Sequence, residues 1–170
     1  TAVNDAPVLD ASGTPSLTTI SEDETSNSGD LVSTLVGSSI SDVDSGAVEG
    51  IAVTGLVSGN GTWQFSTNAG TSWSNVGAVA ATSALLLRES DKLRFVPDGQ
   101  NADSGSLTYV AWDQTSGTAG TTADASVGGG TTAFSTVSET ATISVTAVND
   151  APVLDASGTP SLTTISEDET

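Results

Sequence analysis

Short segments of alternating or wholly apolar residues recur along the chain, and Gly, Asn, Asp and Ser separate them. Thr and β-branched residues dominate these segments, which is typical of β-strands rather than of helices. The predicted strands are Pro7–Leu9, Ser16–Ile20, Leu31–Val36, Gly50–Leu56, Thr62–Ser66, Thr71–Val76, Ala84–Leu87, Lys92–Val96, Ser106–Trp112 and Ala141–Val148. Turn residues recur about every ten residues, a spacing that favours an all-β fold, a β-sandwich with Greek-key connections.

Three stretches depart from the strand pattern. The Ala-rich stretch Ala78–Leu87 is the one place where a short helical turn is expected. Ser21–Asp30 is acidic and Ser-rich, and Gln114–Thr132 is a low-complexity stretch that contains Gly128–Gly130, so both are predicted loops. We expect the second loop to bulge into solvent at one end of the sandwich, with a binding loop as the alternative.

An exact internal repeat sets the organisation of the chain. Thr1–Thr25 returns without a change as Thr146–Thr170, an offset of 146 − 1 = 145 residues. This offset is the size of one ordinary domain, so the chain is one period of a tandem array with the opening of the next. The predicted division is a linker end at 1–5, a β-sandwich repeat at 6–148, and a linker with the truncated start of the next repeat at 149–170. Because two identical copies compete for one first-strand position, we expect 151–170 to be the poorly anchored copy.

The composition narrows the range of partners. Twenty-one Asp and Glu face three Lys and Arg, for a formal net charge of −18, and Cys, Met and His are absent. This polyanion repels nucleic acid and anionic lipid, so we expect neither as a partner and expect divalent cations instead. Since no disulfide is available, bound metal ions could stabilise the fold. No apolar run is long enough for a membrane helix and no signal peptide begins the chain, so we expect export to be directed from elsewhere in a longer polypeptide.

The same composition argues against catalysis. Without His or Cys there is no ordinary catalytic triad, no thiol nucleophile and no imidazole metal site. A carboxylate pair could hydrolyse a glycoside, but nothing places such a pair in an aromatic cleft. We therefore expect that this chain is not an enzyme.

The acidic residues carry the chemistry. Asp42 and Asp44 alternate beside Gly46, so on an extended chain both carboxylates can converge on one cation while Val43 points into the core. Further acidic groups are Glu22-Asp23-Glu24, Glu89-Ser90-Asp91 and Asp113, which follows a predicted strand. Carboxylates with Asn and backbone carbonyls form the ligand set of a hard cation, and Ca²⁺ fits better than Mg²⁺, which gives up its waters reluctantly.

Simpler explanations exist for these clusters. Asp42 and Asp44 could form a solvated Asx turn. Glu22–Glu24 could be a solubilising loop, because runs of like charge are usually exposed. An EF-hand is excluded, since with Asp42 as the first loop position the glycine arrives one place early and the twelfth position is Val53.

The pair Asn4-Asp5 and its copy Asn149-Asp150 each precede Ala-Pro. The proline stiffens the junction and keeps the residue before it extended, which is typical of a linker between rigid modules.

These residues also carry a family resemblance. The linker TAVNDAPVL, residues 146–154, resembles the inter-domain linker of cadherins, Ser41–Gly46 resembles their Asp-x-Asp-x-Gly turn, and Val110–Asp113 resembles their strand ending in Ala-x-Asp. A longer set resembles the cadherin-like tandem repeats of giant bacterial surface adhesins exported by type I secretion: GTWQFSTNAGTSWSNVGAV from Gly61, LRFVPDG from Leu93, AWDQTSGTAG from Ala111 and GGTTAFSTVSETATISVTAVNDAPVL from Gly129. The resemblance implies an Ig-like or cadherin-like sandwich that binds Ca²⁺ and extends a secreted protein on the bacterial cell surface. Its partners would be neighbouring identical repeats, with other cell surfaces or glycans bound by the full protein, and the isolated repeat would be a monomer.

By the same resemblance, calcium at a junction is shared between modules. Asn4, Asp5, Asp42, Asp44 and Asp113 would serve the upstream junction; Glu22 or Glu24, with Glu89 or Asp91, would join Asn149 and Asp150 at the downstream one. Two departures are visible: the linker reads Asn-Asp-Ala where cadherins have Asn-Asp-Asn, and Arg88–Asp91 matches the cadherin Leu-Asp-Arg-Glu motif only loosely.

The aromatic residues leave one alternative function open. Trp63, Phe65, Trp73 and Trp112 could stack on sugars, but Trp63 and Phe65 share a strand face and Trp73 returns across a turn, as core residues of a hairpin would. The alternative is a lectin-like or protein-binding module that uses the 114–132 loop and an exposed Trp. The three cations, Arg88, Lys92 and Arg94, are expected to pair with nearby carboxylates.

Overall fold

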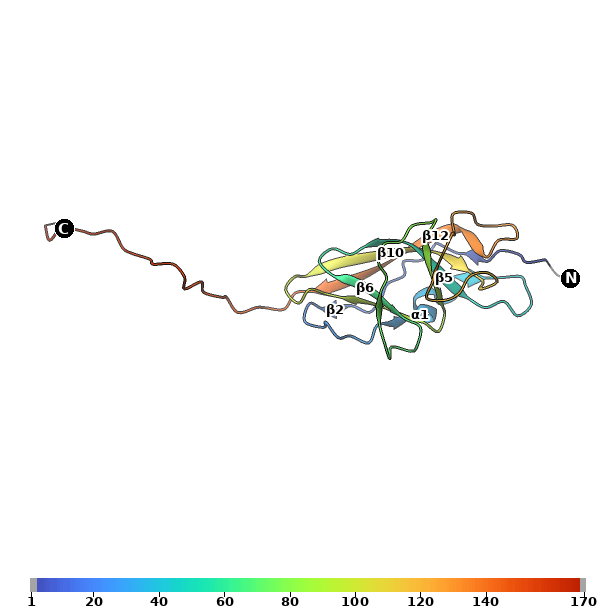
Figure 1. Cartoon of the computed structure of the whole chain (residues 1–170), viewed down its shortest axis with the longest axis horizontal. Coiled ribbons are helices and arrows are strands. Elements are labelled where there is room, and N and C mark those ends of the chain that lie inside the picture. Colours follow the sequence, from blue (N-terminus) through green and yellow to red (C-terminus); the bar gives the residue numbers. More distant parts are fainter. Residues whose placement is uncertain (1–2, 169–170) are drawn as a thin grey trace.

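The computed structural model describes residues 3–168 and confirms the all-β fold (Figure 1). Its elements are β1 (Val8–Leu9), β2 (Ile20–Ser21), β3 (Asp30–Leu31), α1 (Val32–Val36), β4 (Ile40–Ser41), β5 (Gly50–Val57), β6 (Thr62–Ser66), β7 (Ser74–Asn75), β8 (Ala84–Arg88), β9 (Lys92–Val96), β10 (Asp103–Trp112), β11 (Thr122–Ala123) and β12 (Phe134–Thr146). None of the helices in this part of the chain is long and apolar enough to cross a membrane.

Two sheets and a short strand pair make up the fold. The larger sheet has the order β11-β8-β5-β10-β12-β2, the smaller has the order β3-β9-β6-β7, and β1 pairs with β4. The strand pairs are antiparallel except β2 with β12, which run parallel. This parallel pair joins the first part of the chain to its last strand.

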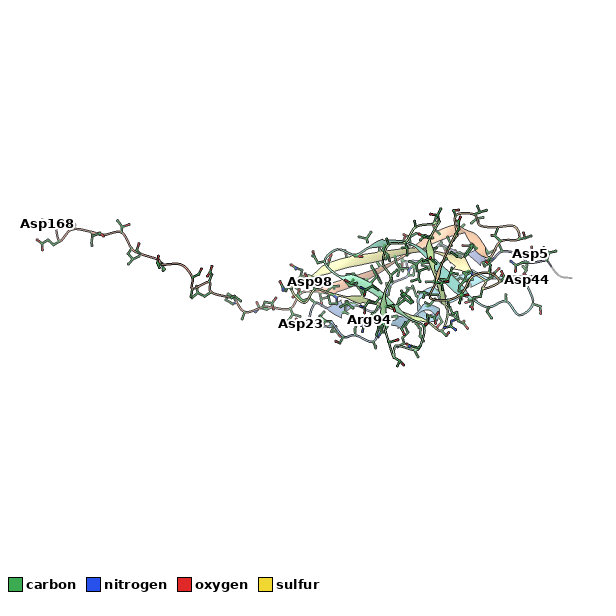
Figure 2. All side chains as sticks on the ribbon, viewed as in Figure 1. Asp5, Asp23, Asp44, Arg94, Asp98 and Asp168 are labelled. Carbon is green, nitrogen blue, oxygen red and sulfur yellow. The ribbon has the colours of Figure 1, made fainter. Side chains whose placement is uncertain are left out.

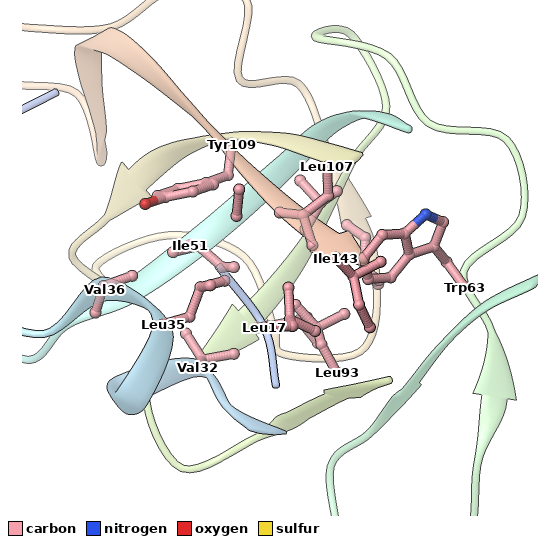
Figure 3. Close-up of a cluster of buried hydrophobic side chains, with 14 of the residues drawn as sticks. Leu17, Val32, Leu35, Val36, Ile51, Trp63, Leu93, Leu107, Tyr109 and Ile143 are labelled. Carbon is pink, nitrogen blue, oxygen red and sulfur yellow. The ribbon is translucent and has the colours of Figure 1, made fainter. Parts of the chain in front are cut away.

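The main core lies between the two sheets (Figure 3). Trp63 and Phe95 from the smaller sheet pack edge to face, with ring centroids 5.2 Å apart. Leu107 and Ile143 from the larger sheet belong to the same buried cluster. Their alternation along each strand puts every second side chain into the space between the sheets, as a sandwich requires.

Of the predicted strand Leu31–Val36, Leu31 alone lies in a strand, and residues 32–36 form a helical turn. Asp30–Leu31 pairs with β9, but Val32, Leu35 and Val36 are buried along α1. Their spacing of three and four residues puts all three on one face of a helix. Conversely, the helical turn expected in Ala78–Leu87 is absent, because Ala80 bridges Ser83 and the rest of that stretch is β8.

Most residues of the 114–132 segment are exposed, in agreement with the predicted solvated loop, but the segment also packs on the larger sheet. It covers the outer face of the larger sheet, where its Ala125 joins Leu86, Val110, Trp112 and Phe134 in a second buried cluster. Within this segment, Thr122–Ala123 form the two-residue strand β11, which was not predicted. It pairs with β8 and extends the larger sheet. The sequence pattern concealed this role because so few side chains in the segment are apolar.

The two copies of the repeated segment lie in different environments. The first copy runs along the sandwich through β1 and β2, whereas residues 151–168 are exposed and contain no strand. Figure 1 shows the second copy leaving the body at the end opposite the N-terminus. We call the end with Asp5 and Asp44 the upstream end and the end with Asp23 and Asp98 the downstream end (Figure 2).

Candidate functional site

The upstream end is built around the incoming chain. Asn4 donates from Nδ2 to Asp113 Oδ2 at 2.9 Å and to the carbonyl of Thr132 at 3.3 Å. The next residue, Asp5, donates its backbone N–H to Asp44 Oδ2 at 2.8 Å. The structure thus brings together four of the five residues predicted for the upstream junction in two direct contacts.

Asp42 supplies the fifth member of this group. Its Oδ1 accepts the backbone N–H of Asp44 at 2.8 Å, which is the Asx turn considered above. Both carboxylates are half-buried, while Val43 is 83% exposed. The expected inward position of Val43 is therefore wrong: past the end of β4 the alternation is kept, but the aspartates take the inward positions.

Asp42 Oδ2 is buried and has no hydrogen-bond partner among the described residues. A buried carboxylate oxygen is costly to leave without a hydrogen bond or a cation. The turn and the cation hypotheses are compatible here, because the turn uses one oxygen of Asp42 and leaves the other unpaired.

Both carboxylate oxygens of Asp113 accept hydrogen bonds. It is 4% exposed, and its Oδ1 accepts both the N–H and the hydroxyl of Thr115, at 2.8 and 2.6 Å. With Oδ2 bound to Asn4, this carboxylate fastens the incoming chain to the end of β10. Asp113 lies at the upstream end, where it was predicted, and its hydrogen bonds hold Asn4 and Thr115 in place.

Glu49 was not singled out in the sequence, yet it lies beside the aspartates. Together with Asp42, Asp44 and Pro7 it lines a cavity of about 190 Å³. Burial, and next the negative charge of Glu89, raises the pKa of Glu49 above its ordinary value. The available signal was its position immediately before β5, at the same end of the strands as Asp113.

Glu89 and Asp91 lie at the upstream end, and not at the downstream end where the family resemblance put them. They occupy the turn between β8 and β9, where Arg88 is opposite Gly50, the first residue of β5. The N–H of Glu89 bonds to the carbonyl of Glu49 at 3.2 Å. The error follows from carrying over a loosely matching motif, because the turn that connects β8 in the larger sheet to β9 in the smaller sheet lies at the other end of the sandwich.

Asp91 has a structural role. It is 1% exposed and accepts hydrogen bonds from Arg88: the backbone N–H at 2.8 Å, Nε at 3.2 Å and Nη2 at 2.8 Å. These contacts close the turn and occupy both carboxylate oxygens.

The downstream end centres on Glu22. This residue is 2% exposed; its N–H bonds to the carbonyl of Thr146 at 3.0 Å, and its Oε1 accepts the N–H of Val148 at 2.5 Å. Glu24 is exposed and accepts the N–H of Ser21 at 2.6 Å. The predicted solvated loop therefore describes Glu24 but not Glu22.

Asn149 and Asp150 follow directly and are exposed. In the part of the chain that the structure describes, their one side-chain hydrogen bond is local, from Asn149 Nδ2 to the carbonyl of Asp150 at 3.3 Å. The structure thus brings Glu22 beside the start of the linker and leaves the linker carboxylate in solvent.

Within residues 3–168, no three acidic side chains are grouped closely enough to hold a metal ion by themselves. The acidic residues are divided between the two ends of the sandwich, as the labelled Asp5 and Asp44 on one side and Asp23 and Asp98 on the other show (Figure 2).

The aromatic and basic residues considered above are mostly buried or make contacts within the fold. Trp63 and Trp112 are each 2% exposed, and Arg94 stacks over the half-buried Trp73 at 4.2 Å. Of the three cations, Arg88 alone forms an ion pair within the described residues. Lys92 bonds to the carbonyl of Ser28 and Arg94 to Gln64 and the carbonyl of Asn27, so the predicted carboxylate pairing is wrong for both.

Comparisons with known protein families, curated proteins and solved structures give no match. The resemblance to cadherin-like repeats therefore rests on the sequence motifs.

Proposed function

We propose that this chain is a repeat of an extracellular array whose neighbouring modules are stiffened by Ca²⁺ at their junctions. Its task would be to extend a bacterial cell-surface adhesin, with neighbouring repeats as its direct partners. The Ig-like or cadherin-like character of the sandwich, the secreted location and the adhesin context come from the motif resemblance. The calcium hypothesis is supported by the geometry of the two ends.

The observation that carries the proposal is the short distance along the chain between the residues that would be fixed to neighbouring modules. Val148 is bound to Glu22 of its own module. By sequence identity Asn149 corresponds to Asn4 and Asp150 to Asp5, so in the next module Asn149 would bond to the counterpart of Asp113. Two extended residues span at most about 7 Å, so the downstream carboxylates of one module would face the upstream carboxylates of the next.

The donor set at such a junction fits calcium. The ion would be held by Asp42, Asp44 and Asp5 of one module, with Glu49 beside them, and by Glu22 or Glu24 of the module before. Oxygen donors of this kind are what Ca²⁺ takes in proteins, and the unpaired Oδ2 of Asp42 has capacity for it. Bound calcium would neutralise part of the charge that otherwise makes facing carboxylates repel one another.

The expected affinity is weak. Extracellular calcium modules bind with dissociation constants on the order of 0.1 to 1 mM, which matches the calcium that surface proteins meet. Without the ion the junction would bend under charge repulsion, and with it successive sandwiches would line up end to end.

The lectin-like alternative has less support. Trp63 and Trp112 are buried, Arg94 covers one face of the half-buried Trp73, and Ala125 of the 114–132 segment packs on the sheet.

The test is a calcium titration of a chain in which residues 1–145 are followed by a full second copy of 1–170. Thermal unfolding and small-angle X-ray scattering are followed together. We expect a higher melting temperature and a longer, narrower particle in calcium, both reversed by EDTA. If neither quantity responds to calcium, the proposal is wrong, and a glycan array would then test the lectin-like alternative.

A further inference from the structure

Identical side chains in the two copies of the repeated segment have opposite exposures. Leu17 is 5% exposed and its counterpart Leu162 is 97% exposed; Leu9 is 3% exposed and Leu154 is 87% exposed; Ile20 is 6% exposed and Ile165 is 70% exposed. The second copy therefore carries in solvent the same apolar residues that the first copy buries in the core.

The first copy is held only by contacts that an identical segment could make. β1 pairs with β4, and β2 runs parallel to β12. Between these strands, Leu17 donates its N–H to the carbonyl of Thr142 at 2.9 Å, and Thr142 donates its own to the carbonyl of Pro15 at 3.1 Å. We call the surface of β4, β10 and β12 that residues 6–21 cover the first-strand groove.

The second copy cannot occupy the first-strand groove of its own body. It leaves the sandwich at Thr146, at the downstream end of β12, whereas the first copy enters at the upstream end. β12 has 13 residues, or about 40 Å at a strand's rise per residue. The five residues from Thr146 to Ala151, where the corresponding segment of the second copy begins, reach only about 17 Å. A free second copy can therefore fill only the groove of another molecule.

We propose that the first-strand groove is a docking site for residues 151–166 of a second copy of this chain, so that chains can join head to tail by exchanging their first strands. The contact is heterologous, because the groove of one molecule receives the tail of the next. It therefore forms closed rings where the rotation between neighbours closes and open chains where it does not.

In the unaltered chain the resident copy has the advantage. It is tethered to its groove through the 23–30 loop, and a short tether corresponds to an effective concentration in the millimolar range. Since the two copies make the same contacts, exchange gains no interaction energy, and the unaltered chain should be a monomer in dilute solution. Exchange becomes favourable once the resident copy is weakened alone.

The repeat supplies its own matched controls for a test in the full chain. Leu17→Asp places a charge in the core position of the resident copy only, and Leu162→Asp makes the same change in the tail only. Masses are measured by size-exclusion chromatography with light scattering. EDTA excludes calcium, so the result is independent of the proposed function, and about 0.15 M salt screens the negative charge over distances beyond about 8 Å.

We expect Leu17→Asp chains to form head-to-tail oligomers whose mass rises severalfold with concentration. Leu162→Asp and the double variant should be monomers, because neither has a competent tail. A large molar excess of a peptide with the sequence of Thr146–Thr170 should return Leu17→Asp to a monomer and raise its melting temperature. Monomeric Leu17→Asp that is indifferent to the peptide would overturn the proposal.

A milder pair, Leu17→Ala and Leu162→Ala, covers the case in which Leu17→Asp does not fold. The peptide should then raise the melting temperature of Leu17→Ala more than that of Leu162→Ala, whose resident copy is intact. Equal responses of the two variants would count against strand exchange.

Discussion

The buried carboxylate of Glu22 accepts the backbone N–H of Val148 at a distance of 2.5 Å. Glu22 comes from the segment that enters at the upstream end, and Val148 is the last residue before the linker pair Asn149-Asp150. One side chain thus joins the first strand, the last strand and the linker, at the end of the sandwich where the next module would begin.

We expect Glu22→Ala to lower the free energy of unfolding by about 1 to 3 kcal/mol, because it leaves the N–H of Val148 without its acceptor and opens a buried site. Urea unfolding of the full chain measures the change. Glu167→Ala is the matched control, since Glu167 is the exposed counterpart of Glu22 in the second copy and should leave stability unchanged. Equal stabilities of the two variants would show that the contact is not stabilising.

The sequence was sufficient to predict strands with regular alternation of apolar residues. It was not sufficient where tertiary contacts decide between a strand and a helix. β6 and β9 match the predicted bounds, because alternating apolar residues face a single core. The prediction was wrong for residues 32–36, because a short run that contains β-branched residues can form a strand or, where the core lies on one side, a helical turn.

The candidate site was predictable in its residue types and only partly in its grouping. The proximity of Asp42 to Asp44 was predictable because the two residues alternate beside Gly46. The placement of Asn4 at the same end was predicted only by the family resemblance. The positions of Glu49 and Glu89 were not predictable, because they depend on the end of the sandwich at which the β8–β9 connection lies. That end is fixed by the pairing of Arg88 with Gly50.

Asp42→Asn with Asp44→Asn tests the upstream carboxylates. In the two-repeat chain, we expect the double variant to lose most of the calcium-dependent rise in melting temperature, because amide oxygens carry no charge to attract the ion. Asp10→Asn, which changes an exposed carboxylate outside the group, should keep the full response. A double variant that responds to calcium like the unaltered chain would remove these aspartates from the site.

Asp91→Asn should separate structure from calcium binding. Its carboxylate is engaged by Arg88, so the substitution should destabilise the fold by about 1 to 3 kcal/mol, with the lower part of the range favoured because Arg88 is 41% exposed. The shift of melting temperature on adding calcium should stay the same as in the unaltered chain. Loss of that shift would restore Asp91 as a ligand candidate, contrary to its contacts.

Glu49→Gln gives a test by pH. Burial, and then the charge of Glu89, raises the pKa of Glu49 in the folded chain above the value of 4.5 expected when unfolded. The charged form is therefore less favourable in the folded state, and its destabilising effect is present above the raised pKa and disappears as the pH falls below about 4.5. The variant, which has no charge to lose, should be more stable than the unaltered chain at pH 7 in EDTA.

The stability difference should shrink as the pH falls through the raised pKa and vanish at about pH 4, as measured by urea unfolding at a series of pH values. Glu167→Gln, an exposed carboxylate in the tail, should give no difference at any pH. A Glu49→Gln difference that does not change with pH would mean that packing, and not charge, distinguishes the two side chains. The predicted dependence would identify a negative charge that the upstream end holds at a cost, as a cation site between modules requires.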